Sequence, residues 1–112
     1  MVATKNIALP GRPVRGSSTG RPIMAAMDLL GRRGALRLLW ELREGRVLTF
    51  RALAEACEAP PGTLNTRLKE LRQAGIVGAE EGYRLTPLGR DLLAALDPLL
   101  AWAETWAAAT DS

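Results

Sequence analysis

The chain has 112 residues, of which 47% are hydrophobic and 24% are charged, and its net charge is +3. This composition is typical of one globular domain, and no apolar stretch reaches the roughly 20 residues of a membrane-spanning helix or forms the apolar segment of a secretory signal. One cysteine and no histidine exclude the usual metal clusters and the Ser-His or Cys-His catalytic arrangements, so we expect no metal, no cofactor and no enzymatic activity. The single cysteine also favours a reducing cytoplasm.

Residues 1–21 are predicted to form a disordered tail rich in Pro, Gly, Ser and basic residues. The tail carries a charge of +4 from Lys5, Arg12, Arg15 and Arg21 and has no acidic residue. The 15 basic residues of the chain therefore leave 11 for residues 22–112, against 12 acidic residues, which is a charge of −1. Two interpretations remain open, a disordered leader or a basic arm that contacts phosphates or a minor groove. We prefer the leader, because no motif supports the arm.

The folded region is predicted to begin with two helices and a short extended segment. Apolar spacing and helix-breaking residues predict a helix over 22–31 that begins at Pro22, and a second helix over 34–44 that ends at Gly45. The second helix has so broad an apolar surface that we expect it to be buried on more than one side. A single brief strand is expected over Val47–Leu48.

The middle of the chain is predicted to contain two helices joined by a tight turn. Thr49 caps a third helix whose apolar side chains include Cys57, and the prolines of "EAPPG" end that helix. A fourth helix opens at Pro61 or Gly62 and ends at Gly75. Its apolar face consists of leucines, whereas the remaining surface carries one acidic residue and three basic residues.

The last third is predicted to form a hairpin and a long helix. Ile76–Val77 and Tyr83–Leu85 flank a polar turn and are typical of two short strands. Thr86 and Pro87 are a strong helix start, so the last helix is expected over 87–107. Pro98 lies inside it, which predicts a kink or break near Asp97.

This order of elements predicts a mainly α fold with a small antiparallel β-hairpin, namely a winged helix-turn-helix. In that geometry the fourth helix enters the major groove of DNA. Hydrogen-bonding and charged side chains at its N-terminal end are candidates for base contacts. These are Thr63, Asn65, Thr66 and Arg67. Three further basic residues, Lys69, Arg72 and Arg51, are candidates for phosphate contacts.

The blocks "LLGRRGALRLLWEL", "TFRALAEA", "TLNTRLKELRQAGIV" and "YRLTPLGRDLL" resemble the HxlR-type winged helix-turn-helix transcriptional regulators, and the last block is shared with MarR-like neighbours. The resemblance covers roughly residues 24–105. It implies that residues 22–112 form the folded domain of a bacterial or archaeal protein. This domain would form a homodimer through its first and last helices. It also implies that the dimer binds a pseudo-palindromic operator in double-stranded DNA.

The chain departs from the family pattern at two places. The predicted wing, residues 80–84, is short and has an acidic tip, which leaves Arg84 as its one candidate for a DNA contact. Several family members sense oxidants through a cysteine near the N-terminus, and this chain has none there. Cys57 is the one redox candidate, but its position on the inward face of a helix is typical of a small buried hydrophobic residue.

Three tryptophans, Trp40, Trp102 and Trp106, are candidates for either a dimer interface or the walls of a small-molecule effector pocket. Packing at an interface is the simpler interpretation, because no polar group converges on them.

A second hypothesis for the whole chain also remains. The near-neutral domain and the acidic wing tip fit a winged-helix protein-interaction module that has lost DNA binding.

Overall fold

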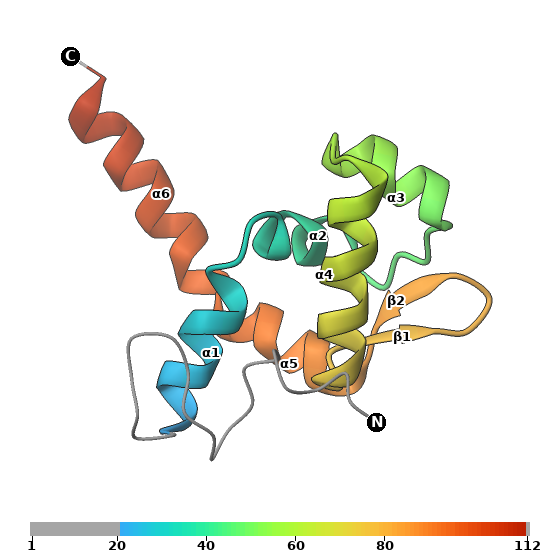
Figure 1. The fold of residues 1–112 in the computed structure, drawn as a ribbon. Helices are drawn as coiled ribbons and strands as arrows, with labels where there is room; N and C mark the ends of the chain where they lie inside the picture. Colours follow the sequence, from blue (N-terminus) through green and yellow to red (C-terminus); the bar gives the residue numbers. More distant parts are fainter. Residues whose placement is uncertain (1–20, 112) are drawn as a thin grey trace.

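The structure is a computed structural model, and it describes residues 21–111. Apart from Arg21, the predicted tail lies outside the described residues. The described region contains six helices and one two-stranded antiparallel sheet (Figure 1). None of its helices combines the length and the apolar character needed to cross a membrane. The predicted fold class, mainly α with a small hairpin, is confirmed.

The elements follow the predicted order along the chain: α1 (Pro22–Leu30), α2 (Ala35–Glu41), α3 (Phe50–Cys57), α4 (Pro61–Gln73), β1 (Val77–Ala79), β2 (Tyr83–Leu85), α5 (Pro87–Ala95) and α6 (Asp97–Thr110). Two predicted helix starts are confirmed by their capping bonds. The hydroxyl oxygen of Thr49 accepts from the amide of Ala52, and that of Thr86 accepts from the amide of Gly89, each at 3.0 Å. Side-chain caps of this kind satisfy amides that have no partner within the helix.

The second helix is shorter than predicted. It ends at Glu41 rather than at residue 44, because the amides of Leu42 and Arg43 donate to carbonyls three residues earlier and tighten the chain into a turn. The expectation that this helix is buried on more than one side is also wrong within one chain. Leu36 and Trp40 are 42% and 38% exposed, since no other element of the described chain covers that side of α2 completely.

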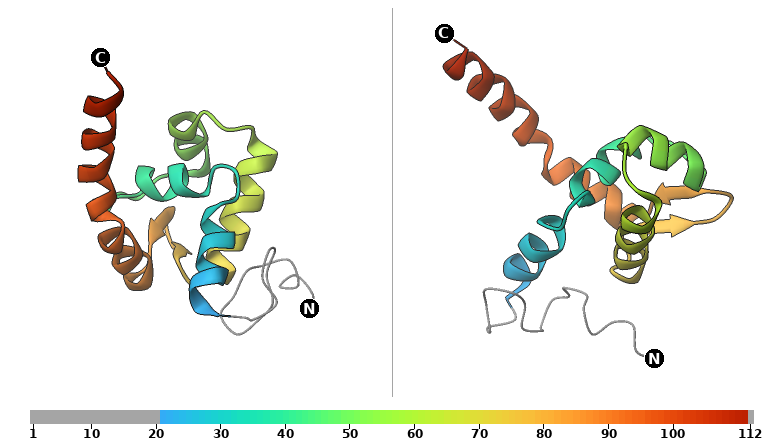
Figure 2. Two further views of the ribbon diagram at one scale, coloured as in Figure 1. Left: turned by 90° about the vertical axis from the view of Figure 1, so that its left-hand side faces the viewer. Right: turned by 45° about the horizontal axis from the view of Figure 1, so that its top comes forward.

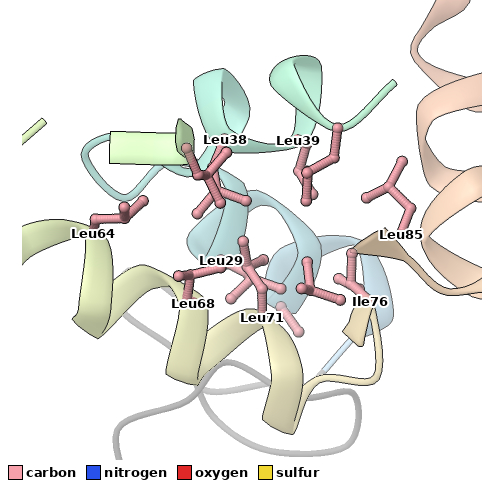
Figure 3. Close-up of a cluster of buried hydrophobic side chains, with 12 residues drawn as sticks. Leu29, Leu38, Leu39, Leu64, Leu68, Leu71, Ile76 and Leu85 are labelled. Carbon is pink, nitrogen blue, oxygen red and sulfur yellow. The ribbon is translucent and has the colours of Figure 1, made fainter. Parts of the chain in front are cut away.

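One apolar core holds the helices and the hairpin together (Figure 3). It is built from the apolar faces of α1, α2, α3 and α4 and from the ends of the hairpin. Its most deeply buried side chains are Leu38, Leu39, Leu42, Leu53, Leu68 and Leu71. Five of these leucines lie within helices that have an apolar residue at every third or fourth position, the spacing that puts side chains on one helical face, and Leu42 directly follows α2.

The hairpin pairs Val77 with Leu85 and Ala79 with Tyr83. The strand predicted before α3 is reduced to a single bridge, in which Leu48 pairs with Tyr83 through two backbone hydrogen bonds of 2.8 and 3.0 Å. This bridge attaches the segment that leads into α3 to β2, the second strand of the hairpin. The hairpin is therefore connected to both helices of the helix-turn-helix.

The long C-terminal helix is broken where Pro98 predicts a break. α5 ends at Ala95, Leu96 is the junction, and α6 begins at Asp97 with Pro98 in its first turn, where the missing amide costs no hydrogen bond. α6 projects away from the rest of the described chain in Figure 1 and in the right-hand view of Figure 2, and none of its residues is buried. Its apolar side chains have little to pack against within one chain.

Candidate nucleic-acid interface

A short turn joins α3 to α4. α3 ends at Cys57, and Glu58 adopts the left-handed conformation with φ 52°, which reverses the chain direction. Pro60 is extended and Pro61 occupies the first turn of α4, where its fixed φ suits the helix. The two helices and their turn form the helix-turn-helix, and the hairpin that follows α4 is its wing (Figure 1).

One face of α4 is apolar and the opposite face is polar and basic. Leu64, Leu68 and Leu71 are almost completely buried in the core. Spacings of four and three residues place Asn65, Lys69 and Arg72 together on the exposed face, and we call these three residues the polar stripe. Hydrogen-bonding side chains flank the stripe, and these belong to Thr66 and Gln73, both exposed.

The only acidic residue of α4 does not lie on the exposed face. Glu70 is 8% exposed and forms ion pairs with Arg32 and Arg67, each at 2.9 Å. Its negative charge is therefore neutralised beneath the helix surface. The exposed face of α4 keeps the two positive charges of Lys69 and Arg72 with no carboxylate of its own helix beside them.

Arg67 lies apart from the polar stripe, which corrects the expectation that it sits with Asn65 and Thr66. Its side chain is only 17% exposed, and its guanidinium donates to the carbonyl oxygen of Arg33 at 3.2 Å while pairing with Glu70. The physical reason is helical position. Residue 67 lies at the border between the buried and exposed faces, so its long side chain reaches inward to a buried carboxylate.

The other predicted base-contact residues differ in accessibility. Thr63 is half-buried, whereas Asn65 and Thr66 are exposed near the start of α4. The hydroxyl of Thr66 donates to the carbonyl oxygen of Gly62 at 3.0 Å, so in the free chain it is satisfied by its own helix. Asn65 is therefore the accessible side chain with both a donor and an acceptor group at this end of the helix.

A groove of about 470 Å³ runs between α4 and the first strand of the wing. It is lined by Lys69, Arg72, Gln73, Val77, Gly78 and Ala79. Two of the polar-stripe side chains thus stand on the wall of a concave surface.

The wing tip carries the exposed carboxylates of Glu80 and Glu81, as the sequence predicts, while Arg84 donates to the carbonyl oxygen of Glu80 at 3.0 Å. Arg84 is therefore tied to its own hairpin.

Arg51, on α3, is a highly accessible member of the predicted phosphate contacts. Its side chain is 92% exposed, and its ion pair with Glu55 spans 4.0 Å. An exposed pair of this length constrains the guanidinium only weakly. Arg51 can therefore change its rotamer to meet an approaching anion.

Known proteins match this arrangement in sequence and in structure. The family of winged helix-turn-helix DNA-binding domains matches residues 35–77, which run from α2 to the start of the wing. A solved structure of quinone-bound YodB from B. subtilis is 32% identical and superposes with a TM-score of 0.68, covering 74% of this chain and 96% of that one. The chain belongs to the winged helix-turn-helix transcriptional regulators.

Regulators from distant organisms show the same kinship. An uncharacterised HTH-type transcriptional regulator of Mycobacterium tuberculosis is 35% identical over 99 residues, or 81% of this chain. The present chain spans only about 60% of the length of that mycobacterial relative. An uncharacterised HTH-type regulator of Methanocaldococcus jannaschii is 27% identical over 89 residues, covering 74% of this chain and 83% of the relative.

The three tryptophans of the regulator lie in two separate places. Trp102 and Trp106 stack on each other on α6, with ring centroids 5.5 Å apart, and both are more than half exposed. Trp40 instead lines a groove of about 540 Å³ between α2 and the α5–α6 junction, where the guanidinium carbon of Arg43 lies 4.2 Å from its ring centroid. The residues that line this groove do not include the two tryptophans of α6.

Cys57 is half-buried at the end of α3. Burial raises the pKa of its thiol, and the negative charge of Glu41 raises it further against the opposing effect of Arg37. A thiol with a raised pKa holds its proton at neutral pH and is a poor nucleophile.

Within the part of the chain that the structure describes, no group of three His, Cys, Asp or Glu side chains is placed to bind a metal ion.

Sequence reasoning missed one group of side chains near the interface. Asp28, Arg32 and Glu70 join α1 to α4 through ion pairs of 2.8 and 2.9 Å. Two signals for it are present in the sequence, the four-residue spacing of Asp28 and Arg32 and the three-residue spacing of Arg67 and Glu70. Nothing in those local spacings indicates that the two pairs meet.

Proposed function

We propose that the regulator is a sequence-specific DNA-binding protein of the HxlR type, which acts in the cytoplasm as a homodimer with α4 in the major groove of a pseudo-palindromic operator. One observation carries this proposal. The exposed face of α4 presents Asn65, Lys69 and Arg72 without a competing carboxylate, because the acid of that helix is neutralised inside the fold. Such a face attracts the phosphate backbone and can read base edges at the same time.

The residues divide into two roles by reach and chemistry. Asn65, with Thr63 and Thr66 beside it, is proposed to contact base edges near the start of α4, because an amide can pair with the hydrogen-bonding edge of adenine. Lys69, Arg72 and Arg51 are proposed to hold phosphates. Lys69 and Arg72 stand beside the groove between α4 and the wing, where a sugar-phosphate strand can lie.

Arg67 and Arg84 are given lesser roles. Arg67 is engaged by Glu70 and by a backbone carbonyl, so its contribution is proposed to be indirect. Arg84 is bound to its own hairpin turn. The wing tip, with its two exposed carboxylates, is repelled by phosphates and is proposed to stand off the DNA.

The dimer is proposed to form through α1 and α6. Ile23 and Met27 on α1 and Trp102 and Trp106 on α6 are all 55% to 59% exposed, which is an unusual density of large apolar side chains on a soluble surface. Sedimentation equilibrium of the full chain should give a dimer. Met27→Glu should shift it toward the monomer, whereas Glu104→Gln on α6, which adds no apolar surface, should leave the dimer intact.

DNA binding is tested by selecting duplexes from a random pool and measuring affinity against salt concentration. The affinity should fall steeply with salt, and Lys69→Ala or Arg72→Ala should each lower the slope by about 1. Arg43→Ala removes the same charge from the groove on the α5–α6 side and should leave the slope unchanged. Asn65→Ala should weaken the selected site by about 1–3 kcal/mol and relax its sequence preference.

The results distinguish this proposal from its alternative. The exposed carboxylates at the wing tip favour a protein-interaction module in one respect, since they suit a basic protein surface. A salt-independent, weak association with every duplex would refute the DNA-binding proposal. Capture of one protein partner by the wild-type chain and its loss in Glu80→Lys would then support the module.

A small aromatic effector is a further candidate ligand. YodB was solved with a quinone bound. In the present chain the groove beside Trp40 combines an aromatic ring with the cation of Arg43, which suits a planar aromatic molecule. Hydroquinone should raise the Tm of the wild-type chain and leave the Tm of Trp40→Ala unchanged if it binds at this site, because a ligand that binds only the folded state raises stability.

A further inference from the structure

Four charged side chains form a continuous row between the first helix and the helix proposed to read DNA. Asp28 of α1 pairs with Arg32 at 2.8 Å, Arg32 pairs with Glu70 of α4 at 2.9 Å, and Glu70 pairs with Arg67 at 2.9 Å. Their side chains are only 8% to 17% exposed. We call this group the charged row, and its formal charges cancel.

The charged row holds α4 to the α1–α2 segment at two separate points. Arg32 reaches Glu70, and Arg67 reaches the carbonyl oxygen of Arg33 at 3.2 Å. Apolar packing between leucines is not directional, so it tolerates small rotations of a helix about its axis. Hydrogen bonds and ion pairs have preferred distances and angles, so two of them on one side of a helix resist such rotation.

Stability alone does not account for this group. A buried ion pair contributes little compared with apolar residues of the same volume, because desolvation offsets the attraction between the charges. The row is also incompletely satisfied. The Nε atoms of Arg32 and Arg67 and the Oε1 atom of Glu70 are buried without a hydrogen bond, although Arg67 Nε lies 2.9 Å from that oxygen.

The contacts of Arg32 within the row also favour its charged form. Burial by itself would lower the pKa of Arg32, but its hydrogen bond to Asp28 and the charge of Glu70 reverse this effect, so its pKa is raised. Arg32 therefore keeps its positive charge at neutral pH.

We propose that Glu70 is a positioning residue for DNA recognition, because its ion pair with Arg32, together with the hydrogen bond from Arg67 to the carbonyl oxygen of Arg33, sets the rotation of α4 about its own axis. This inference rests on the proposed function. Side-chain tips lie about 5–6 Å from a helix axis, so a rotation of about 20° moves them by about 2 Å. That displacement is enough to break hydrogen bonds between Asn65 and a base edge. Lys69 and Arg72 have long, flexible side chains and can still reach phosphates.

The test replaces the tie without changing the net charge. Arg32→Met combined with Glu70→Met removes one positive and one negative charge, but it also takes these ion-pair partners from Asp28 and Arg67, so the folding of the variant is checked first by circular dichroism. The matched control applies the same two changes to another pair, Arg37→Met with Glu41→Met, which is joined at 2.8 Å within α2. Neither Arg37 nor Glu41 belongs to the polar stripe.

Two measurements are made on the full-length chains. Affinity for a duplex selected with the wild-type chain should fall about tenfold or more in the Arg32→Met, Glu70→Met protein, whereas affinity for a random duplex should change by less than about threefold. Residual dipolar couplings of the α4 amides should show a changed orientation of α4 relative to α1. The control pair should show neither effect.

The outcomes separate this inference from the proposed function. If α4 keeps its orientation and the selected duplex is bound as tightly as by the wild type, the positioning role is wrong. If the wild-type chain itself prefers no duplex, the proposed function is wrong, and the dipolar couplings still decide whether Glu70 orients the helix. If the double variant does not fold, Glu70→Gln, which keeps the side-chain shape and removes only its charge, is measured in the same way with the same deciding outcomes.

Discussion

Replacing Gly89 by alanine should destabilise the regulator even though alanine is the better helix former. Gly89 is a buried residue in the first turn of α5, where a Cβ atom would overlap the carbonyl oxygen of Ile76 and lie 3.2 Å from its carbonyl carbon. The neighbouring atom is backbone, so no side chain can rotate to relieve the overlap. The same carbonyl oxygen accepts from the amide of Thr86 at 3.0 Å, which ties the start of α5 to the start of the wing.

The expected change in the free energy of unfolding is the sum of two destabilising effects and one stabilising effect. Overpacking costs about 1–3 kcal/mol when backbone has to move. Losing the hydrogen bond from Thr86 to Ile76 costs about 1 kcal/mol more. Alanine returns about 1 kcal/mol relative to glycine inside a helix. We therefore expect Gly89→Ala to lower the free energy of unfolding by about 2 kcal/mol, or Tm by about 10 °C for a domain of this size.

The assay is urea unfolding followed by far-ultraviolet circular dichroism, at one protein concentration because dimer formation would make the stability concentration-dependent. Gly62→Ala is the matched control. Gly62 lies in the first turn of α4, and its Cβ would meet no atom within 4 Å, so that substitution should be neutral or stabilise by up to about 1 kcal/mol. If Gly89→Ala is as stable as Gly62→Ala, the close approach of α5 to Ile76 is not a real constraint.

Three further predictions concern the core, a helix cap and the thiol. Leu53→Ala, at a side chain that is 0% exposed, should lower the free energy of unfolding by about 2–5 kcal/mol in urea, and Leu88→Ala, at an exposed position, should cost far less. Thr49→Ala should cost about 1 kcal/mol in the same assay, whereas an unchanged midpoint would mean that the cap bond to Ala52 contributes nothing. Cys57 should react with iodoacetamide at pH 7.5 more slowly in the folded chain than in urea, because burial raises the pKa of its thiol and so lowers the thiolate fraction. Equal rates of reaction in the folded chain and in urea would contradict a raised pKa for the Cys57 thiol.

Much of the fold could be predicted because its signals are local. The capping threonines, the prolines at helix starts and the leucines at helical spacing act on their immediate neighbours, and the structure confirms them. The break near Asp97 follows in the same way from the missing amide of Pro98. The end of α2 could not be predicted from local signals. It ends at Glu41 because the chain must turn toward the hairpin, where Leu48 pairs with Tyr83.

The sequence by itself determined which residues share each face of α4, because helical periodicity assigns faces without knowledge of the partner. It therefore predicted that leucines point inward and that a polar, basic surface points outward. Only the tertiary structure decided what the long side chains at the border contact. Arg67 and Glu70 turn inward because α1 and its following turn bring Arg32 to that side of the helix, 38 residues away along the chain. A contact over that sequence separation depends on how helices pack, which no local pattern encodes.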